Sequence, residues 1–251
     1  MRLRTDFLQQ TFNTAINFLY PTQCRICENQ IGLSVVPFLC NVCWNSIDFI
    51  KQPFCEICGT PNIDGTCADC DMNPPRYGKL RTIALYKRAL QQAIHQFKFE
   101  KRTNLAKYLI QLIIAHIPSD CNITEYDYII PIPIHKIRLN ERGFNQSIIL
   151  SNGIAENYHV EVRTDLLIRR KNTSPQSSLD REKRKSNIIG AFGLENSEQL
   201  QGKKLLVFDD VFTTGATIQE AVNVLWEADP TEIDVLTLAR TPPYTNDSVV
   251  T

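Results

Sequence analysis

Apolar residues fall in two kinds of run along the chain, and together these runs predict an α/β fold. Short, nearly continuous runs at 126–134, 205–208 and 232–240 are typical of strands that are buried on both faces. Apolar residues three and four positions apart predict helices over 89–97 and 104–117. We therefore predict a mostly parallel sheet flanked by helices.

Weaker patterns complete the expected organisation. Further strands are predicted at 82–86, 160–169 and 190–194, the last of them completing the sheet. A short amphipathic helix is expected over 1–20, and the prolines and glycine of 71–79 indicate a linker. The predicted units are the helix 1–20, a cysteine module 21–73, an α/β domain 80–241 and a frayed tail 242–251.

The strand at 205–208 is followed by the most informative stretch of the chain. Two carboxylates, Asp209 and Asp210, come directly after the strand, and a turn of small residues precedes an amphipathic helix that begins near Ile218. The turn consists of Thr213, Thr214, Gly215, Ala216 and Thr217. Backbone N–H groups at a helix N-terminus suit a phosphate, and carboxylates suit vicinal hydroxyls or hydrated Mg²⁺. The alternative is an ordinary strand end with an incidental acid pair.

This stretch resembles the signature of type I phosphoribosyltransferases. The resemblance implies that Asp209 and Asp210 hold the ribose hydroxyls and act as the catalytic residues. It also implies that the turn from Thr213 to Thr217 binds the 5′-phosphate of phosphoribosyl pyrophosphate, with Mg²⁺ as the accompanying cation.

A second candidate anion site follows the strand at 126–134. Lys136, Arg138 and Arg142 supply cationic donors, and Gly143 permits a tight turn before a helix that begins near Asn145. A loop at the end of a parallel strand is the expected place for a ligand, so we predict that these cations bind pyrophosphate. A solvated basic turn is the alternative.

Eight of the nine cysteines form four C-x-x-C pairs between residues 24 and 70. Such pairs supply thiolates for tetrahedral zinc, and sequential pairing into two ribbons is favoured because each ribbon then closes locally. Disulfides, redox sites and iron–sulfur clusters fit the spacing less well. We predict two structural zinc ions, held by Cys24, Cys27, Cys40, Cys43, Cys55, Cys58, Cys67 and Cys70. Cys121 stands alone and is expected to be a buried or incidental thiol.

The motif P-I-P-I-H-x-x-R-L-x-x-R-G-F-N-Q-S, at 131–147, closely resembles a stretch of the ComF family (ComFC/GntX-like proteins), and the likeness extends over about 20–240. It implies an N-terminal double zinc ribbon ahead of a phosphoribosyltransferase-type domain. It also implies a link to DNA uptake in natural transformation, with single-stranded DNA and DNA-uptake or recombination proteins as partners.

The segment 169–185, which we call the hood segment, carries seven basic and two acidic residues, a local excess of five. It is expected to form either a lid over pyrophosphate, with Lys171, Arg181 and Arg184 as ligands, or a patch for single-stranded nucleic acid. The alternative is a solvated charged loop that binds no ligand.

Charge and composition narrow the choice of partners. The formal net charge is zero, so binding to nucleic acid or membrane has to come from a local patch. The N-terminal 20 residues are too polar for a signal peptide or a membrane span, which predicts a cytoplasmic protein. Two hypotheses remain: a pyrophosphate-releasing phosphoribosyltransferase, or an adaptor that keeps the nucleotide site without turnover and binds single-stranded DNA.

Overall fold

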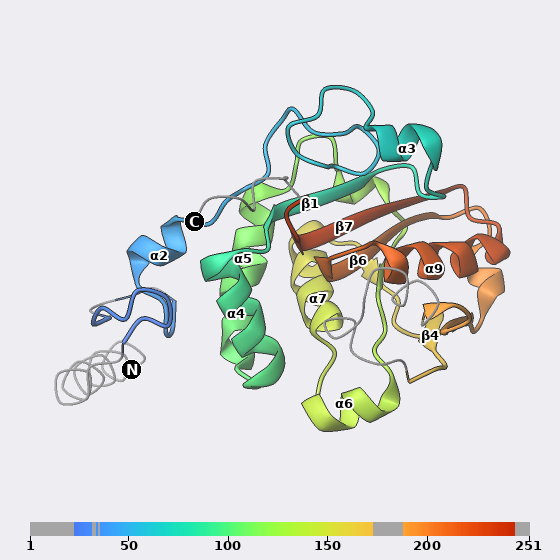
Figure 1. The fold of residues 1–251 in the computed structure, drawn as a ribbon. Coiled ribbons are helices and arrows are strands. Elements are labelled where there is room, and N and C mark those ends of the chain that lie inside the picture. The colour runs from blue at the N-terminus through green and yellow to red at the C-terminus, as the bar shows by residue number, and fades with distance from the viewer. Residues whose placement is uncertain (1–22, 32–33, 35, 173–187, 244–251) are drawn as a thin grey trace.

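A five-stranded, wholly parallel sheet forms the centre of the protein, as the computed structural model shows for residues 23–31, 34, 36–172 and 188–243 (Figure 1). The strand order is β1-β7-β6-β2-β3. The strands are β1 (Leu80–Leu85), β2 (Tyr128–Pro131), β3 (Glu161–Val162), β6 (Lys204–Phe212) and β7 (Glu232–Arg240). The predicted α/β class with a mostly parallel sheet is confirmed.

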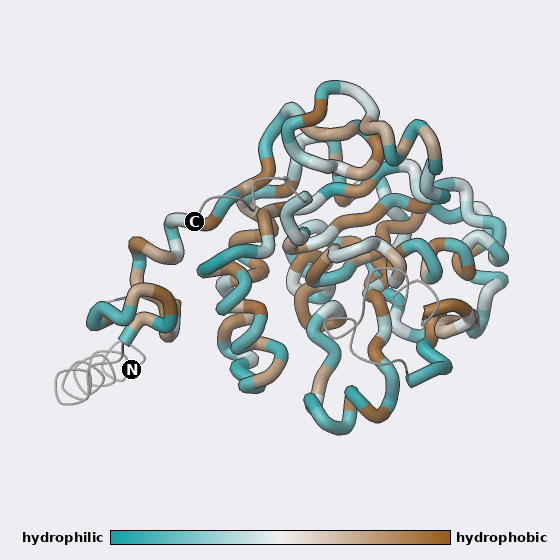
Figure 2. The backbone as a smooth tube through the Cα atoms, in the orientation of Figure 1, coloured by the Kyte–Doolittle hydropathy of each residue, from teal (hydrophilic) through white to brown (hydrophobic). Residues whose placement is uncertain are grey.

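The central strands are apolar because helices or other elements cover both of their faces. Leu205, Leu206, Val207 and Phe208 are all fully buried, although successive side chains point to opposite sides of the sheet. Figure 2 shows the same pattern, with hydrophobic strands in the interior and hydrophilic residues on the outer turns of the helices.

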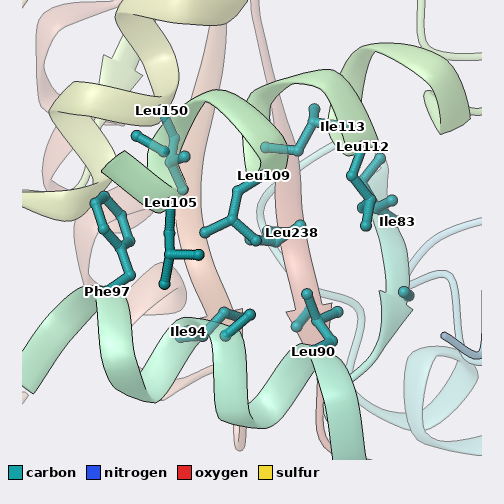
Figure 3. Packing of buried hydrophobic residues seen from close by; sticks show 14 of the residues in the cluster. Ile83, Leu90, Ile94, Phe97, Leu105, Leu109, Leu112, Ile113, Leu150 and Leu238 are labelled. Carbon is teal, nitrogen blue, oxygen red and sulfur yellow. The ribbon is translucent and has the colours of Figure 1, made fainter. Parts of the chain in front are cut away.

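Helices α4 (Arg88–Phe99), α5 (Ala106–His116) and α7 (Gln146–Tyr158) belong to one face of the sheet. Their apolar stripes interlock with residues of β1 and β7, including Ile83 and Leu238 (Figure 3). Each fully buried leucine or isoleucine contributes roughly 1.5–3 kcal/mol relative to an exposed one. The two predicted helices, 89–97 and 104–117, correspond to α4 and α5.

The opposite face carries α9 (Ala216–Leu225), the 3₁₀-helix η5 (Trp226–Ala228) and a small antiparallel ribbon. This ribbon pairs β4 (Leu167–Arg169) with β5 (Phe192–Leu194). The predicted strand at 160–169 is therefore wrong as one element, because bends at 164–166 separate β3 from β4. The segment 190–194 does not complete the main sheet, because its only described strand pairs with β4 instead.

Short helices connect these layers. They are α2 (Asn41–Asn45), α3 (Ala68–Met72), η1 (Thr103–Leu105), η2 (Ile123–Glu125), α6 (Lys136–Arg142) and η4 (Ser197–Leu200). None of the helices within the described ranges has the length and hydropathy that a membrane crossing requires.

The two cysteine modules lie at different places on the molecule. The first, with α2, is beside α4, and the second, with α3, lies over the β1 edge of the sheet (Figure 1). Between them, Ile50 N–H donates to the carbonyl of Ile83, and Leu85 N–H donates to that of Asp48. These bonds cover backbone groups that an edge strand would otherwise expose.

The segment 71–79, predicted as a linker, packs closely on the α/β domain. Gly78 N–H donates to the Ile233 carbonyl, and Trp226 Nε1 donates to the Arg76 carbonyl. The predicted helix at 1–20 and the tail from 244 onward lie outside the described residues, so the bounds of the four predicted units stay predictions.

The direction of the strand order reverses between β2 and β6. After β2 the chain moves outward to β3, whereas after β6 it moves in the opposite direction to β7. Connections that diverge in this way leave an opening beyond the carboxyl ends of the two strands, which is where ligands bind in open α/β sheets.

Candidate functional site

The acid pair lies inside the last part of β6. The strand was predicted to end at Phe208, but β6 continues to Phe212 because β7 pairs with it beyond that point. Asp209 is in register with Thr237, and Val211 is in register with Ala239. The prediction that the acids follow the strand is therefore corrected: the two carboxylates start from opposite faces of the sheet.

Asp210 belongs to the face covered by α4 and forms an ion pair with Lys98, near the end of that helix. The Asp210 residue is only 3% exposed, so its charge needs a partner. Lys98 was not predicted as a site residue. The signal was available, because Lys98 falls four positions after the buried Ile94 and so continues the apolar stripe of α4.

Asp209 is half-buried and faces a small pocket. Its Oδ1 accepts hydrogen bonds from Ser147 Oγ at 3.1 Å and from the Asp210 N–H at 2.9 Å. Burial, followed by the nearby Asp210 charge, raises the pKa of Asp209 to about 7. Ser147, in the first turn of α7 and itself fully buried, is a second residue that the sequence interpretation missed.

The turn after β6 forms the rest of this pocket. Gly215 has φ 77° and caps α9, and a side chain there would approach the Phe212 ring to 2.9 Å. The first N–H groups of a helix have no partner within it, so those of α9 are suited to an anion. The pocket is lined by Asp209, Val211, Phe212, Thr213, Gly215, Thr217 and Ile218. Of the predicted turn, Thr214 and Ala216 are adjacent in sequence but do not line it.

The predicted cationic loop after β2 is a helix. α6 begins after His135, whose Nδ1 accepts from the Ile137 N–H, and ends at Gly143, which has φ 88°. α7 then begins with Asn145 as its N-cap, close to the predicted position. Figure 1 shows α6 projecting away from the sheet beneath α7.

The three predicted cations of this region occupy different positions. Arg142 is half-buried, and its guanidinium donates to Gln146 Oε1. Its pKa is lowered by burial, an effect that the nearby Asp210 charge opposes. Arg138 is half-buried, whereas Lys136 is exposed at the first turn of α6.

Arg169, on β4, adds a cation that was not predicted as a ligand. Burial lowers its pKa, the Arg138 charge lowers it further, and the Asp209 charge opposes both. Arg169 is therefore close enough to both Arg138 and Asp209 for their charges to act on it.

The hood segment is described only at its base. Lys171 Nζ donates to the Ile189 carbonyl at 2.9 Å, and Gly190 N–H donates to Glu220 on α9. Lys171 therefore connects the end of β4 to the chain at Ile189. Arg181 and Arg184 lie outside the described residues.

The cysteines gather into two groups of four, in sequential order. Cys24, Cys27, Cys40 and Cys43 form the first cysteine centre, and Cys55, Cys58, Cys67 and Cys70 form the second. Within each centre all sulfur atoms lie within 4.8 Å of one another.

The sulfur spacing fits zinc. Zn–S bonds of about 2.3 Å in a tetrahedron place two sulfurs about 3.8 Å apart. Cys27 and Cys40 have sulfurs 3.7 Å apart, as do Cys58 and Cys67. The geometry supports structural zinc in both centres. Cys121 is buried, as expected of a thiol outside the centres, and burial raises its pKa to about 12.

Two family profiles match the chain. Residues 15–71 match the double zinc ribbon domain, and residues 145–249 match the phosphoribosyl transferase domain. The phosphoribosyl transferase match includes the whole stretch from the acid pair to α9. The double zinc ribbon match includes all eight cysteines of the two centres.

Relatives extend the likeness over most of the chain. The DNA utilization protein YhgH of Shigella flexneri is 31% identical over 226 residues, which cover 88% of this chain and 98% of the relative. Competence protein ComFC of Bacillus subtilis is 25% identical over 86% of this chain and 93% of the relative.

Among solved structures, the allosteric regulatory enzyme of purine biosynthesis shares 22% identity, over 54% of this chain and 25% of that one, with a TM-score of 0.34. This last likeness is too partial to carry an argument. The two profiles and the near-complete alignment with YhgH agree with the sheet, the acid pair and the cysteine centres, and the chain belongs to the ComF family.

Proposed function

We propose that the pocket between β6 and α9 binds phosphoribosyl pyrophosphate or a phosphoribosylated nucleotide. The observation that carries this proposal is that Asp209 lines the same small pocket as Thr213, Gly215 and Thr217. A ribose 5-phosphate group needs an anion site and a hydroxyl acceptor that lie this close together. A helix N-terminus supplies the first, and a carboxylate supplies the second.

The cations around the acid pair supply the other half of the site. The charges of Arg138 and Asp209 both act on Arg169, and the charge of Asp210 acts on Arg142. In the proposal they take the charge of pyrophosphate, together with Lys136 and the hood residues Lys171, Arg181 and Arg184. Positioning and stabilisation of the departing pyrophosphate are the contributions such a site makes to displacement at the anomeric carbon.

In this proposal Mg²⁺ is held mainly by the phosphates of the bound ligand and only to a small extent by the protein. Asp210 is committed to Lys98, which leaves Asp209 as the carboxylate that lines the pocket. Mg²⁺ usually keeps several waters and binds one or two carboxylates together with substrate phosphates. Asp209 would therefore meet the ion directly or through water, and Mg²⁺ would neutralise pyrophosphate charge.

The role we propose for this site is in DNA uptake or utilisation. It is supported by relatives named for DNA utilization and competence. A cytoplasmic location belongs to the same proposal, because zinc centres need cysteines that stay reduced.

Turnover is tested by incubating zinc-loaded protein with phosphoribosyl pyrophosphate, Mg²⁺ and a panel of nucleobases, and measuring pyrophosphate release. The enzyme hypothesis predicts base-dependent release that is lost in Asp209→Asn. If pyrophosphate is released with every base only at the rate measured without protein, while the ligand still binds, the enzyme hypothesis is refuted. The adaptor that binds a nucleotide without turnover is then the hypothesis that stands.

A second candidate, single-stranded DNA binding, is supported by the surface around α6. This helix buries none of its residues, and it exposes Ile137 and Leu139 beside its basic side chains. Phe99 is 62% exposed, and the Arg142 guanidinium lies 5.4 Å from its ring. Exposed aromatic rings with adjacent cations are the platforms on which unpaired bases stack.

The test of this candidate is a fluorescence-anisotropy salt series with single-stranded DNA. Binding should fall steeply with salt, and Lys136→Gln should lower the slope by about 0.7 for its one phosphate contact. Phe99→Ala should weaken binding at every salt concentration without changing the slope. No binding by the wild type at low salt would remove this candidate and leave the hood segment as a lid.

A further inference from the structure

Arg240, near the carboxyl end of β7, is a buried cation that the proposed chemistry does not use. It is 6% exposed, and its side chain points toward the second cysteine centre. Nη1 donates to the Cys58 carbonyl at 2.8 Å, and Nη2 donates to Thr60 Oγ1 at 3.1 Å. Burial of a guanidinium is costly unless its donors are paired, and Nε has no hydrogen-bond partner among the described residues, so the two contacts of Nη1 and Nη2 are the ones that hold the ribbon against the strand.

Thr60 extends this contact to a ligand sulfur. Its Oγ1 lies 3.0 Å from Cys58 Sγ. Because Oγ1 already accepts a hydrogen bond from Arg240, its own proton is available to the sulfur, and a thiolate is a good acceptor. Arg240, Thr60 and Cys58 thus form one hydrogen-bonded chain that ends at the second cysteine centre.

The same guanidinium also lies against the phosphate pocket. Its carbon is 4.9 Å from the centre of the Phe212 ring, and Arg240 is in register with Phe212 across β6 and β7. Phe212 lines the pocket, and its ring limits the space beside Gly215. A displaced ring would therefore change the conformation of the turn that caps α9.

The next residue, Thr241, reinforces the connection through the backbone. Thr241 N–H donates to the Phe212 carbonyl at 2.9 Å, and Thr241 Oγ1 lies 3.4 Å from the Thr213 carbonyl. The end of β7 therefore fixes both the ring that shapes the pocket and the first residue of its turn.

We propose that Arg240 is a positioning residue that couples the second cysteine centre to the phosphate turn 213–217. Metal at that centre and ligand in the pocket then stabilise each other, a reciprocity that linkage requires. The ligand half of this coupling rests on the proposed function. Arginine suits the role because its edge donates two hydrogen bonds while its face contacts a ring, which a lysine ammonium cannot do simultaneously.

Arg81 provides a matched control. It is another buried arginine that holds the same ribbon, through the Glu56 carbonyl at 2.9 Å and the Phe54 ring at 4.8 Å. Arg81 lies near the amino end of β1, whereas Arg240 pairs with Leu85 at the carboxyl end. Loss of Arg81 should loosen the ribbon without acting on Phe212.

The test is hydrogen exchange of the full zinc-loaded chain, read in three sets of peptides: the first centre, the second centre and the turn 212–217. Chelator is added in steps. In the wild type, protection of the turn should be lost together with that of the second centre, whatever the state of the first. Arg240→Met removes both hydrogen bonds, to Cys58 and Thr60, and should speed exchange in the turn at least about tenfold before any chelator, since tenfold is the effect of losing even one charge-assisted hydrogen bond. Arg240→Lys should not restore it.

Arg81→Met should speed exchange in the second centre, on the side of Phe54 and Glu56, and should change exchange in the turn far less than Arg240→Met does. Thr60→Val, which removes the acceptor but keeps Arg240, gives a milder variant should Arg240→Met fail to fold, and it too should speed exchange in the turn. The proposal is overturned if the turn stays protected after the second centre has unfolded, or if Arg81→Met affects the turn as strongly as Arg240→Met.

A separate arm adds phosphoribosyl pyrophosphate and Mg²⁺, which should delay loss of protection in the second centre and leave the first unchanged. Binding of this ligand without any such delay would overturn the coupling. Absence of binding would instead refute the proposed function, while the chelator series still decides the role of Arg240.

Discussion

Asp209 and Asp210 are neighbours in the chain but have different surroundings. Asp210 is paired with a lysine on the α4 face, whereas Asp209 lines the pocket and accepts from a serine hydroxyl. The resemblance to type I phosphoribosyltransferases predicted that both aspartates bind the ribose hydroxyls. The contacts instead favour Asp209 as the residue that meets ligand and Asp210 as the one that holds Lys98.

The raised pKa of Asp209 predicts a specific pH dependence of stability. An unfolded aspartate has a pKa of about 3.9, so the native state binds this proton more tightly, and stability falls as pH rises toward the folded pKa of about 7. Asp209→Asn removes that loss. Urea unfolding from pH 6 to 8 should therefore show a variant whose advantage over wild type grows with pH. A constant difference between the two would contradict the raised pKa.

Lys98 should matter for stability through its partner. Removing it by Lys98→Met leaves Asp210 as a buried, unpaired charge, which costs about 3 kcal/mol or more. In the Asp210→Asn background the same change should cost much less, because no charge is left to pair. The double-mutant cycle is measured by urea unfolding at pH 8, and additive losses would rule out the coupling.

Much of the candidate site could be predicted residue by residue, because the acid pair, the turn and the helix are contiguous in sequence. Lys98 and Ser147 were missed because their importance depends on tertiary contacts from other helices. The place of Lys98 on the apolar stripe of α4 indicates a partly buried lysine, but no local motif identifies Asp210 as its partner or Asp209 as the partner of Ser147.

At the scale of elements, the turn before α9 depends on one glycine. Gly215 has φ 77°, and an added Cβ would lie 2.9 Å from the Phe212 ring. Gly143 has a similar φ of 88°, and no heavy atom of the described residues, its two chain neighbours aside, lies within 4 Å of an added Cβ, so Gly143→Ala isolates the backbone cost. Gly143→Ala should lose roughly 1–2 kcal/mol in unfolding free energy. Gly215→Ala should lose more and also weaken ligand binding, and equal losses with unchanged binding would contradict this account of the turn.

Two elements show where sequence patterns were insufficient. The segment 136–142 was predicted as a loop because its basic residues obscure a periodic face, but His135 and Gly143 are effective helix caps, and α6 forms between them. The segment 160–169 has the composition of one strand. Its division into β3 and β4 depends on pairing with two different sheets, which no local pattern specifies.

For the whole molecule, the sequential cysteine pairs predicted both centres correctly. The place of the second ribbon on the β1 edge could not be predicted, because it depends on Arg81 and Arg240, which read in sequence as ordinary charged strand residues. Burial and donor pairing become visible only when the strands are assembled.

The metal content follows from the two centres. The ribbons have little core of their own, so zinc should supply much of their folding free energy. Protein purified without added metal should contain two zinc ions per chain by elemental analysis, and chelation should unfold the ribbons by circular dichroism. Clearly fewer than one ion per chain would contradict both centres, and one ion would mean that one centre does not bind.

The central claim is that the pocket beside Asp209 binds a phosphoribosyl ligand. Isothermal titration calorimetry of phosphoribosyl pyrophosphate with Mg²⁺ at pH 8 tests it most directly, with Asp209→Asn as the site variant and Asp71→Asn, at an exposed position on α3 outside the pocket lining, as the control. One ligand should bind per wild-type chain, Asp209→Asn should weaken binding about tenfold or more through a lost charge-assisted hydrogen bond, and Asp71→Asn should bind as wild type does. No saturable binding by the wild type, or equal affinity in Asp209→Asn, would contradict the claim.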